Sequence, residues 1–175
     1  MRTGQVVIVG ACRTAIGKFG GSLAGVPPAA LGAKVIQEAI SQASIGREEV
    51  DEAILGCVLT AGQGMNVARQ AVLGAGLPEG VCAYTVNKVC GSGLKSVILG
   101  AQSIALGESD IVVAGGVENM SQAPYLTRDS RWGARLGHKE HIDSLLYDGL
   151  RDVFCDCHMG ETAENIAVEF SISRR

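Results

Sequence analysis

The chain has 175 residues, with 15 lysines plus arginines against 18 aspartates plus glutamates, and neither sign of charge gathers into a long run. Nucleic acids and anionic membrane surfaces select clustered basic residues, so this charge pattern argues against both kinds of partner. Glycine is abundant, with 24 residues, and aromatic side chains make up only 4%, which suits closely packed layers of helices and strands.

The first part of the chain predicts strands and helices in alternation. Val6–Val9 is a β-branched run and is expected to form a strand, because it is too short for a signal peptide. Pro27 and Pro28 open a predicted helix, which apolar residues at helical spacing continue. A second strand is expected over residues 53–59 and a second helix over residues 66–73. No run approaches the ~18 apolar residues of a membrane-spanning helix, so none is predicted.

The third strand–helix unit carries the clearest pattern. Residues 81–86 predict a strand and residues 87–93 a turn. Apolar residues then recur every three or four positions from Leu94 to Ala105, as on one face of a helix. Ile111–Ala114 predicts a short buried strand. Repeated units of this kind predict an α/β fold with a mainly parallel sheet and helices on both of its faces.

The regular pattern stops after Gly116. Residues 117–158 show little periodicity, and an irregular segment of ~40 residues points to a functional or partner-contacting region. Trp132 and three nearby arginines fit either a subunit contact, which favours Trp and Arg, or an exposed loop. Helical spacing resumes over residues 162–170.

The six cysteines do not resemble a disulfide framework, which belongs to small, loop-rich secreted chains. We therefore expect reduced thiols. His138 and His141, together with Cys155 and Cys157, invite a zinc hypothesis. The Cys-x-Cys spacing is tighter than that of zinc sites, so these side chains are expected to be solvated or to line a pocket, and no metal is predicted.

Cys90 is the candidate nucleophile, because it lies between a predicted strand and a predicted helix. The free N–H groups at a helix start favour an anion such as a thiolate. Gly91 and Gly93 leave room for a substrate carbonyl near the backbone, as in the nucleophile elbow of hydrolases. Position alone equally allows Cys90 to be a small buried residue, and Lys88 to be either its charge partner or a solvated side chain.

The residues around Cys90, VNKVCGSGLKS at positions 86–96, resemble the thiolase signature that surrounds the acyl-enzyme cysteine. The His158-Met159 pair is typical of thiolases that form acetoacetyl-CoA. Ketosynthases share the fold and a cysteine in the same place, but the residues around that cysteine differ from these. Further matches span the chain in order at residues 13–17, 66–70, 114–121 and 158–165.

The resemblance implies a thiolase-like layered fold, with an N-terminal core half in residues 1–118 and the beginning of a loop domain in residues 119–175. Family subunits are about twice as long. Their C-terminal half supplies an Asn-Glu-Ala-Phe segment, a histidine in Gly-His-Pro that activates the nucleophile, and a second cysteine that handles the substrate proton. None of the three occurs here, so the chain alone is expected to be incomplete for turnover.

The resemblance also implies a reaction. Cys90 would take an acetyl group from acetyl-CoA, and a second acetyl-CoA would attack this thioester to give acetoacetyl-CoA, with thiolysis as the reverse reaction. The Cys90 N–H would contribute to an oxyanion hole. Leu150, His158 and Met159 match positions that line the pantetheine and acyl pocket.

Two other functions stay open, a longer-chain 3-ketoacyl-CoA thiolase and a non-catalytic CoA-binding or assembly subunit. We expect a cytoplasmic homo-oligomer, either a dimer or a tetramer, or a complex with a second chain that supplies the C-terminal half. No cofactor beyond the CoA thioester substrate is expected.

Overall fold

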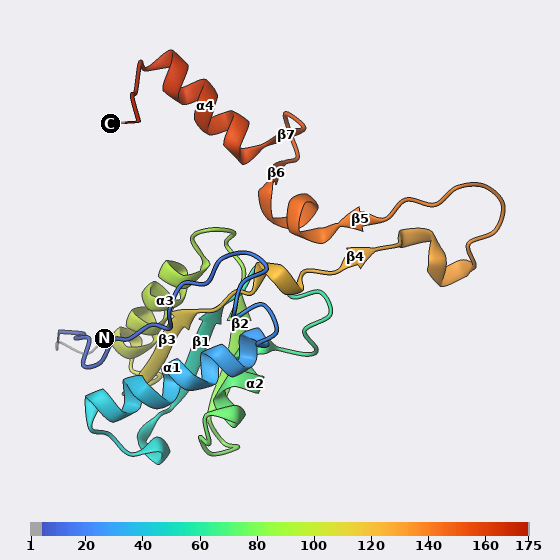
Figure 1. The fold of residues 1–175 in the computed structure, drawn as a ribbon. Helices are drawn as coiled ribbons and strands as arrows, with labels where there is room; N and C mark the ends of the chain where they lie inside the picture. The colour runs from blue at the N-terminus through green and yellow to red at the C-terminus, as the bar shows by residue number, and fades with distance from the viewer. Residues whose placement is uncertain (1–4, 175) are drawn as a thin grey trace. The chain divides into compact units, whose positions relative to one another are not determined.

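A computed structural model describes residues 5–174. The chain forms two compact units, which divide between Gln122 and Ala123. The first unit contains a three-stranded sheet and three helices, and the second contains short elements and a final helix (Figure 1). Each unit is considered separately below.

The sheet of the first unit has three parallel strands in the order β2-β1-β3. Both strand pairings are parallel, which confirms the predicted parallel sheet. Gly56 at the end of the central strand lies opposite Val86 on one side and Gly116 on the other. The carboxyl ends of all three strands therefore meet at one edge. The strands are β1 (Glu52–Gly56), β2 (Cys82–Val86) and β3 (Val112–Gly116).

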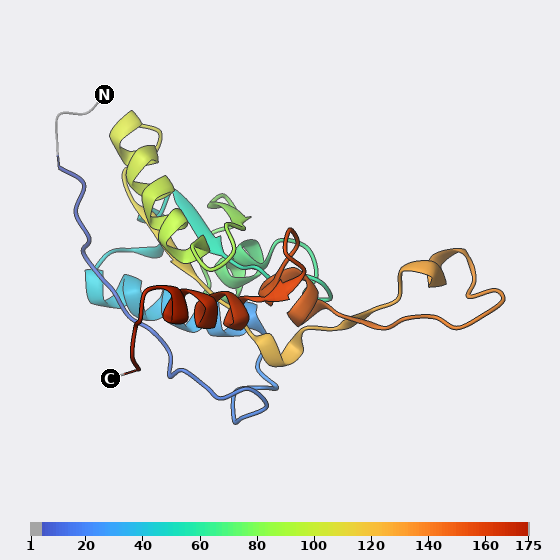
Figure 2. The same cartoon turned by 90° about the horizontal axis from the view of Figure 1, so that it is seen from above.

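Helices cover both faces of this sheet. Side chains alternate along a strand, so Leu55 packs into the core under α1 and α2, whereas Gly56 faces the start of α3. Figure 2 shows the strands between α1 and α3. Pro28 begins α1 as predicted, and the Asn66 side chain caps α2 by accepting the Arg69 N–H at 3.2 Å. The helices are α1 (Pro28–Ala43), α2 (Val67–Gly74) and α3 (Ser92–Leu106), with a short 3₁₀ turn at Arg47–Glu49.

The apolar core lies between the sheet and the α1/α2 layer, where small side chains allow close packing. A Cβ on Gly32 of α1 would approach Ala71 of α2 at 3.0 Å. Burial of this apolar surface is the main stabilising contribution to the unit. The core consists of Ala33, Ile36, Ile40, Val50, Ala53, Leu55, Ala68, Ala71, Val72, Ala75, Leu77 and Val81.

Helix α3 packs against the other face of the sheet through small residues, among them Ser96 and Gly100, and leaves Leu94 and Leu106 exposed. Within residues 5–174, one segment, Val89–Leu106, is long and apolar enough by length and composition to cross a membrane. This segment includes Lys95, Ser96 and Gln102, so it does not contradict the prediction that no continuous run of ~18 apolar residues exists. It is weak evidence for a membrane span, because core helices of soluble proteins share these properties.

The predicted N-terminal strand is also absent. Val6–Val9 forms no ladder in the part of the chain that the structure describes, and Ile8 is 77% exposed. A strand needs a neighbour for its backbone groups, and Val6–Val9 pairs with neither outer strand of the sheet, β2 or β3. The next segment is anchored by side chains instead, since the Gly20 N–H donates to Ser121 Oγ at 2.9 Å.

The second unit consists of short elements, as its lack of periodicity predicts. Figure 1 shows β4 and β5 side by side, joined by a long loop. The predicted helix near the end is present, beginning at Met159 rather than Thr162. The elements after β3 are a 3₁₀ turn (Met120–Gln122), β4 (Tyr125–Leu126), a 3₁₀ turn (Arg128–Trp132), β5 (Ile142–Asp143), a π-helix (Leu145–Leu150), β6 (Arg151–Asp152), β7 (Cys157–His158) and α4 (Met159–Glu169).

Candidate active site

Cys90 lies in the turn between β2 and α3, and its side chain is exposed. The helix that follows β1 lies on one face of the sheet, and the helix that follows β2 lies on the other. Open α/β sheets bind ligands where two neighbouring strands diverge in this way, outside their carboxyl ends. Cys90 therefore occupies the topological switch point of the sheet.

Hydrogen bonds from side chains define the shape of the turn before Cys90. Val89 has a left-handed backbone, with φ of 48°, and its N–H donates to Asn87 Oδ1 at 2.9 Å. The Ser92 hydroxyl accepts the Lys88 N–H at 2.8 Å and donates to the Val89 carbonyl at 2.6 Å. The main chain on both sides of Val89 is thus held by side chains of the same turn.

Glycines let α3 begin directly against the strand ends. A Cβ on Gly56 would lie 2.5 Å from the carbonyl carbon of Ser92 and 2.6 Å from the Gly93 nitrogen. The Ser96 hydroxyl lies 2.6 Å from the carbonyl oxygens of both Gly93 and Gly115, which links α3 to β3. The position of the helix start, two residues after Cys90, is therefore fixed by backbone contact with β1 and by a side-chain link to β3.

The carboxylate of Glu118 organises the loop that follows β1. It accepts the N–H groups of Val58 at 2.8 Å and Leu59 at 3.1 Å, which explains why β1 ends at Gly56 rather than at the predicted residue 59. Burial, followed by the charge of Glu118, raises the pKa of Cys57 to about 12. Cys57 is therefore a protonated, buried thiol and a poor nucleophile.

The remaining free thiols of the first unit lie elsewhere. Cys12 is half-buried, and burial followed by the charge of Glu38 raises its pKa. Cys82 is exposed, but it is the first residue of β2 and so lies at the amino end of the strand, whereas Cys90 follows the carboxyl end. Cys90 alone among these cysteines is both exposed and at the carboxyl edge.

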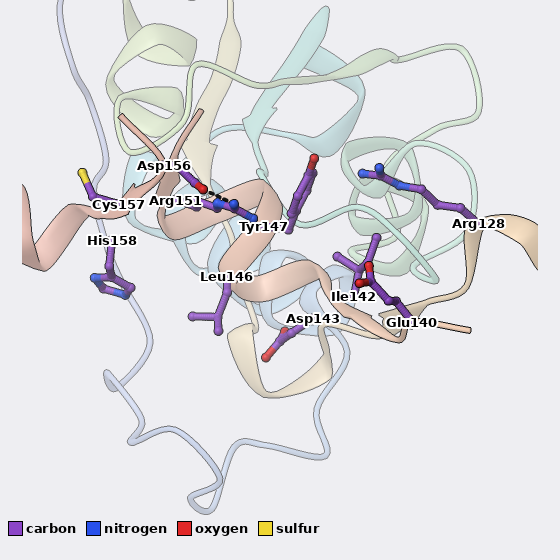
Figure 3. Close-up of a pocket in the computed structure, with 10 residues that line it drawn as sticks. All are labelled: Arg128, Glu140, Ile142, Asp143, Leu146, Tyr147, Arg151, Asp156, Cys157 and His158. Atoms are coloured by element: carbon purple, nitrogen blue, oxygen red, sulfur yellow. Dashed lines mark ion pairs between the residues drawn. The ribbon is translucent and has the colours of Figure 1, made fainter. Parts of the chain in front are cut away.

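The second unit contains a cavity of about 590 Å³. Tyr147 lies between two guanidinium groups in this cavity, with Arg128 at 4.8 Å and Arg151 at 5.4 Å from the ring centre (Figure 3). A hydrogen bond from Arg128 and its positive charge lower the pKa of Tyr147. The lining residues are Arg128, Glu140, Ile142, Asp143, Leu146, Tyr147, Arg151, Asp156, Cys157 and His158.

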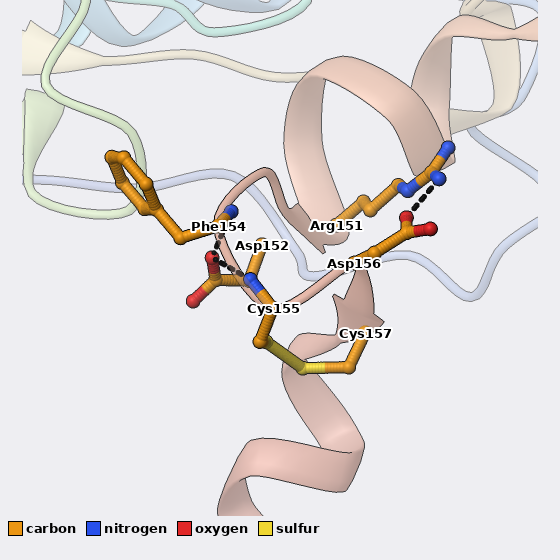
Figure 4. A network of polar contacts seen from close by, with 6 residues as sticks. All are labelled: Arg151, Asp152, Phe154, Cys155, Asp156 and Cys157. Carbon is orange, nitrogen blue, oxygen red and sulfur yellow. Dashed lines mark hydrogen bonds and ion pairs between the residues drawn. A yellow bond between two sulfur atoms is a disulfide. The ribbon is translucent and has the colours of Figure 1, made fainter.

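The turn between β6 and β7 contains a disulfide between Cys155 and Cys157 (Figure 4). The prediction of reduced thiols was wrong for this pair, because the tight turn brings their Cα atoms within 5.4 Å. Arg151 and Asp156 form an ion pair across the turn, and Asp152 Oδ1 accepts the Phe154 N–H at 2.8 Å. Across residues 5–174, no three His, Cys, Asp or Glu side chains are grouped as metal ligands.

Comparison with known proteins identifies the family. Residues 6–175 match the thiolase N-terminal domain. The chain belongs to the thiolase family. It is 56% identical over 170 residues to an acetyl-CoA acetyltransferase of Pseudomonas aeruginosa, and 55% identical over 170 residues to a probable acetyl-CoA acyltransferase of Staphylococcus aureus. Each alignment covers 97% of this chain and 43% of the relative, so the chain spans less than half the length of these thiolases.

The three residues predicted to contact CoA all belong to the second unit of this thiolase chain. His158 caps α4, since its Nδ1 accepts the Gly160 N–H at 2.8 Å, and it lines the cavity. Met159 is the exposed first residue of α4, and Leu150 is the half-buried last residue of the π-helix. Of the three, only His158 is among the cavity-lining residues, and their role in CoA binding stays a prediction.

Sequence reasoning assigned no role to Asn87, Ser92 or Glu118, although all three lie inside the thiolase motifs. The available signal was their type and position, since each is a side-chain acceptor beside a turn or a strand end. Only the structure shows which backbone groups they bind.

Proposed function

We propose that this chain is the N-terminal part of an acetyl-CoA C-acetyltransferase, which condenses two acetyl-CoA molecules to acetoacetyl-CoA and CoA. The observation that carries the proposal is the exposed Cys90 at the switch point of the sheet in a thiolase chain. The name of the Pseudomonas relative and the His158-Met159 pair favour the acetyl reaction.

The proposed reaction has two acyl-transfer steps. The Cys90 thiolate attacks the acetyl-CoA carbonyl, the carbon–sulfur bond to CoA breaks, and CoA leaves as a thiol after taking a proton. A base then removes a proton from the methyl group of a second acetyl-CoA, and the resulting carbanion attacks acetyl-Cys90. The Cys90 sulfur leaves as acetoacetyl-CoA forms.

General bases and oxyanion donors commonly contribute ~10²–10⁴-fold each to such steps. By the family pattern the base for the second acetyl-CoA and the donors for its enolate oxygen come from the C-terminal half. We therefore expect the 175-residue chain by itself to be acylated slowly at most, and to release no acetoacetyl-CoA.

The test joins this chain to the remaining C-terminal length of the Pseudomonas relative. After incubation with acetyl-CoA, peptide mass spectrometry is expected to find the acetyl group on Cys90, and acetoacetyl-CoA should accumulate. Cys90→Ala should abolish both, whereas Cys82→Ala removes another exposed thiol and should leave both unchanged. Turnover that persists in Cys90→Ala would refute the proposed role of Cys90.

Two alternatives make different predictions in the same assay. A longer-chain 3-ketoacyl-CoA thiolase would cleave longer 3-ketoacyl-CoA substrates faster than acetoacetyl-CoA, and the broader name of the Staphylococcus relative favours this possibility. A non-catalytic subunit would bind CoA without acylation of Cys90. The proposed reaction needs no cofactor beyond the CoA thioester, and we propose a cytoplasmic location.

We also propose that the loop between β4 and β5 joins copies of the protein into a dimer or tetramer. Its apolar side chains are unusually exposed, with Trp132 at 82% and Leu136 at 97%. Deletion of residues 128–136 should lower the oligomeric state measured by sedimentation and leave the circular dichroism spectrum of the fold in place. An unchanged assembly would exclude this loop as the contact.

A further inference from the structure

The backbone conformation of Val89 is unusual for its residue type. Its φ of 48° lies in the left-handed region, where a β-branched side chain meets the most steric strain. The side chain is 51% exposed, so burial of Val89 offers little compensation. A strained residue persists only where its surroundings determine its conformation.

Ser92 supplies much of that constraint. Its hydroxyl accepts the N–H of Lys88 and donates to the carbonyl of Val89, so its single hydrogen and an oxygen lone pair are both used on the residues before Cys90. The hydroxyl is buried, since Ser92 is only 4% exposed. Because Ser92 is also the first residue of α3, it ties the turn to a helix whose position Gly56 fixes.

We propose that Ser92 is a positioning residue, which holds Val89 in its left-handed conformation and thereby sets the orientation of the Cys90 thiol toward an acyl thioester. Asn87 assists, because its side chain accepts the Val89 N–H. If Val89 relaxed to a negative φ, the peptide that joins it to Cys90 would rotate and the thiol would move. The inference rests on the proposed role of Cys90 as the acyl-carrying nucleophile.

The test separates positioning from packing by a double-mutant cycle. The rate of Cys90 alkylation by iodoacetamide is measured in the full chain by peptide mapping, with circular dichroism as the check on folding. Ser92→Ala should slow alkylation by clearly more than about threefold, because the reactivity of a thiol depends on its exposure and surroundings, which rotation of the Val89–Cys90 peptide would change. Ser103→Ala is the matched control, since this buried serine of α3 bonds to Ser109 and should leave the rate unchanged.

Val89→Gly provides the decisive background, because glycine adopts a positive φ without strain. In Val89→Gly the further change Ser92→Ala should slow alkylation only about threefold or less, since little strain remains to be held. Equal slowing by Ser92→Ala in both backgrounds would show that Ser92 acts through packing, and would overturn the proposal. No slowing in either background would overturn it as well.

If Ser92→Ala does not fold, Asn87→Ala serves in its place, because Asn87 is exposed. Its effect should likewise shrink in the Val89→Gly background, and an equal effect in both backgrounds would refute the inference. Alkylation uses no CoA substrate. A failure to form acetoacetyl-CoA would therefore count against the proposed function, but it would not affect the conclusion drawn from the alkylation rates.

Discussion

Substitution of Gly56 by alanine should displace the start of α3. The added Cβ would lie 2.5 Å from the Ser92 carbonyl carbon, and ordinary contact begins at 3.4 Å, so the backbone must move by about 0.9 Å (3.4 − 2.5). The obstructing atoms are backbone atoms of Ser92 and Gly93 and the Ser92 Cβ, and no side-chain rotation moves any of them. Overpacking of this kind costs ~1–3 kcal/mol, and the shift near Cys90 should slow its alkylation, because thiol reactivity depends on exposure and local surroundings.

Urea unfolding and the rate of Cys90 alkylation test this expectation in the full chain. Gly80→Ala is the matched control, because a Cβ at Gly80 meets no atom within 4 Å and its φ is not left-handed. The control should be neutral or stabilise the chain by ~0.4–1 kcal/mol, since alanine restricts the unfolded state. A Gly56→Ala protein as stable as Gly80→Ala, with Cys90 reacting at the wild-type rate, would refute the close contact between β1 and α3.

Three further predictions concern the cysteines. Iodoacetamide should label Cys90 faster than Cys57, because burial and Glu118 keep the Cys57 thiol protonated; peptide mapping after limited labelling checks this, and equal labelling would contradict it. Because the folded-state pKa of Cys57 is raised from 9.0 to about 12, its stabilising contribution is complete below pH 9 and is lost as the pH rises toward 12. The unfolding free energy should accordingly fall less steeply above pH 9 in Cys57→Ala than in the wild type, and parallel curves would exclude the shift. Cys155 and Cys157 should take up iodoacetamide only after reduction, and uptake without reductant would show free thiols.

Local patterns were sufficient to predict the sheet and its helices. Apolar spacing and the two prolines located α1, and the strand–turn–helix sequence around Cys90 located the candidate nucleophile. These features depend on contacts between residues close in sequence and on periodicity. The thiolase resemblance, carried by residues 86–96, added a chemical role that position alone left open.

The errors share one physical origin, because each depends on contacts distant in sequence or on tight turn geometry. Val6–Val9 has strand-forming residues but pairs with no strand among the described residues, and strand propensity depends on such a neighbour. The end of β1 is set by Glu118, about 60 residues away. The Cys155–Cys157 bond depends on a turn closed by the pairing of β6 with β7. None of these partners is visible in a local window of the sequence.

The amide of Asn119 has a consequence for the order of folding. Its Nδ2 donates to the carbonyl oxygens of Leu23, Ala24 and Val26 at 3.1, 3.1 and 2.8 Å, across more than 90 residues of chain. Asn119 follows β3, the last strand to enter the sheet along the chain. Contacts that close long loops form late, because the entropy of loop closure must first be offset. Residues 23–26 therefore gain this anchor only once β3 has docked, although they are synthesised before β3.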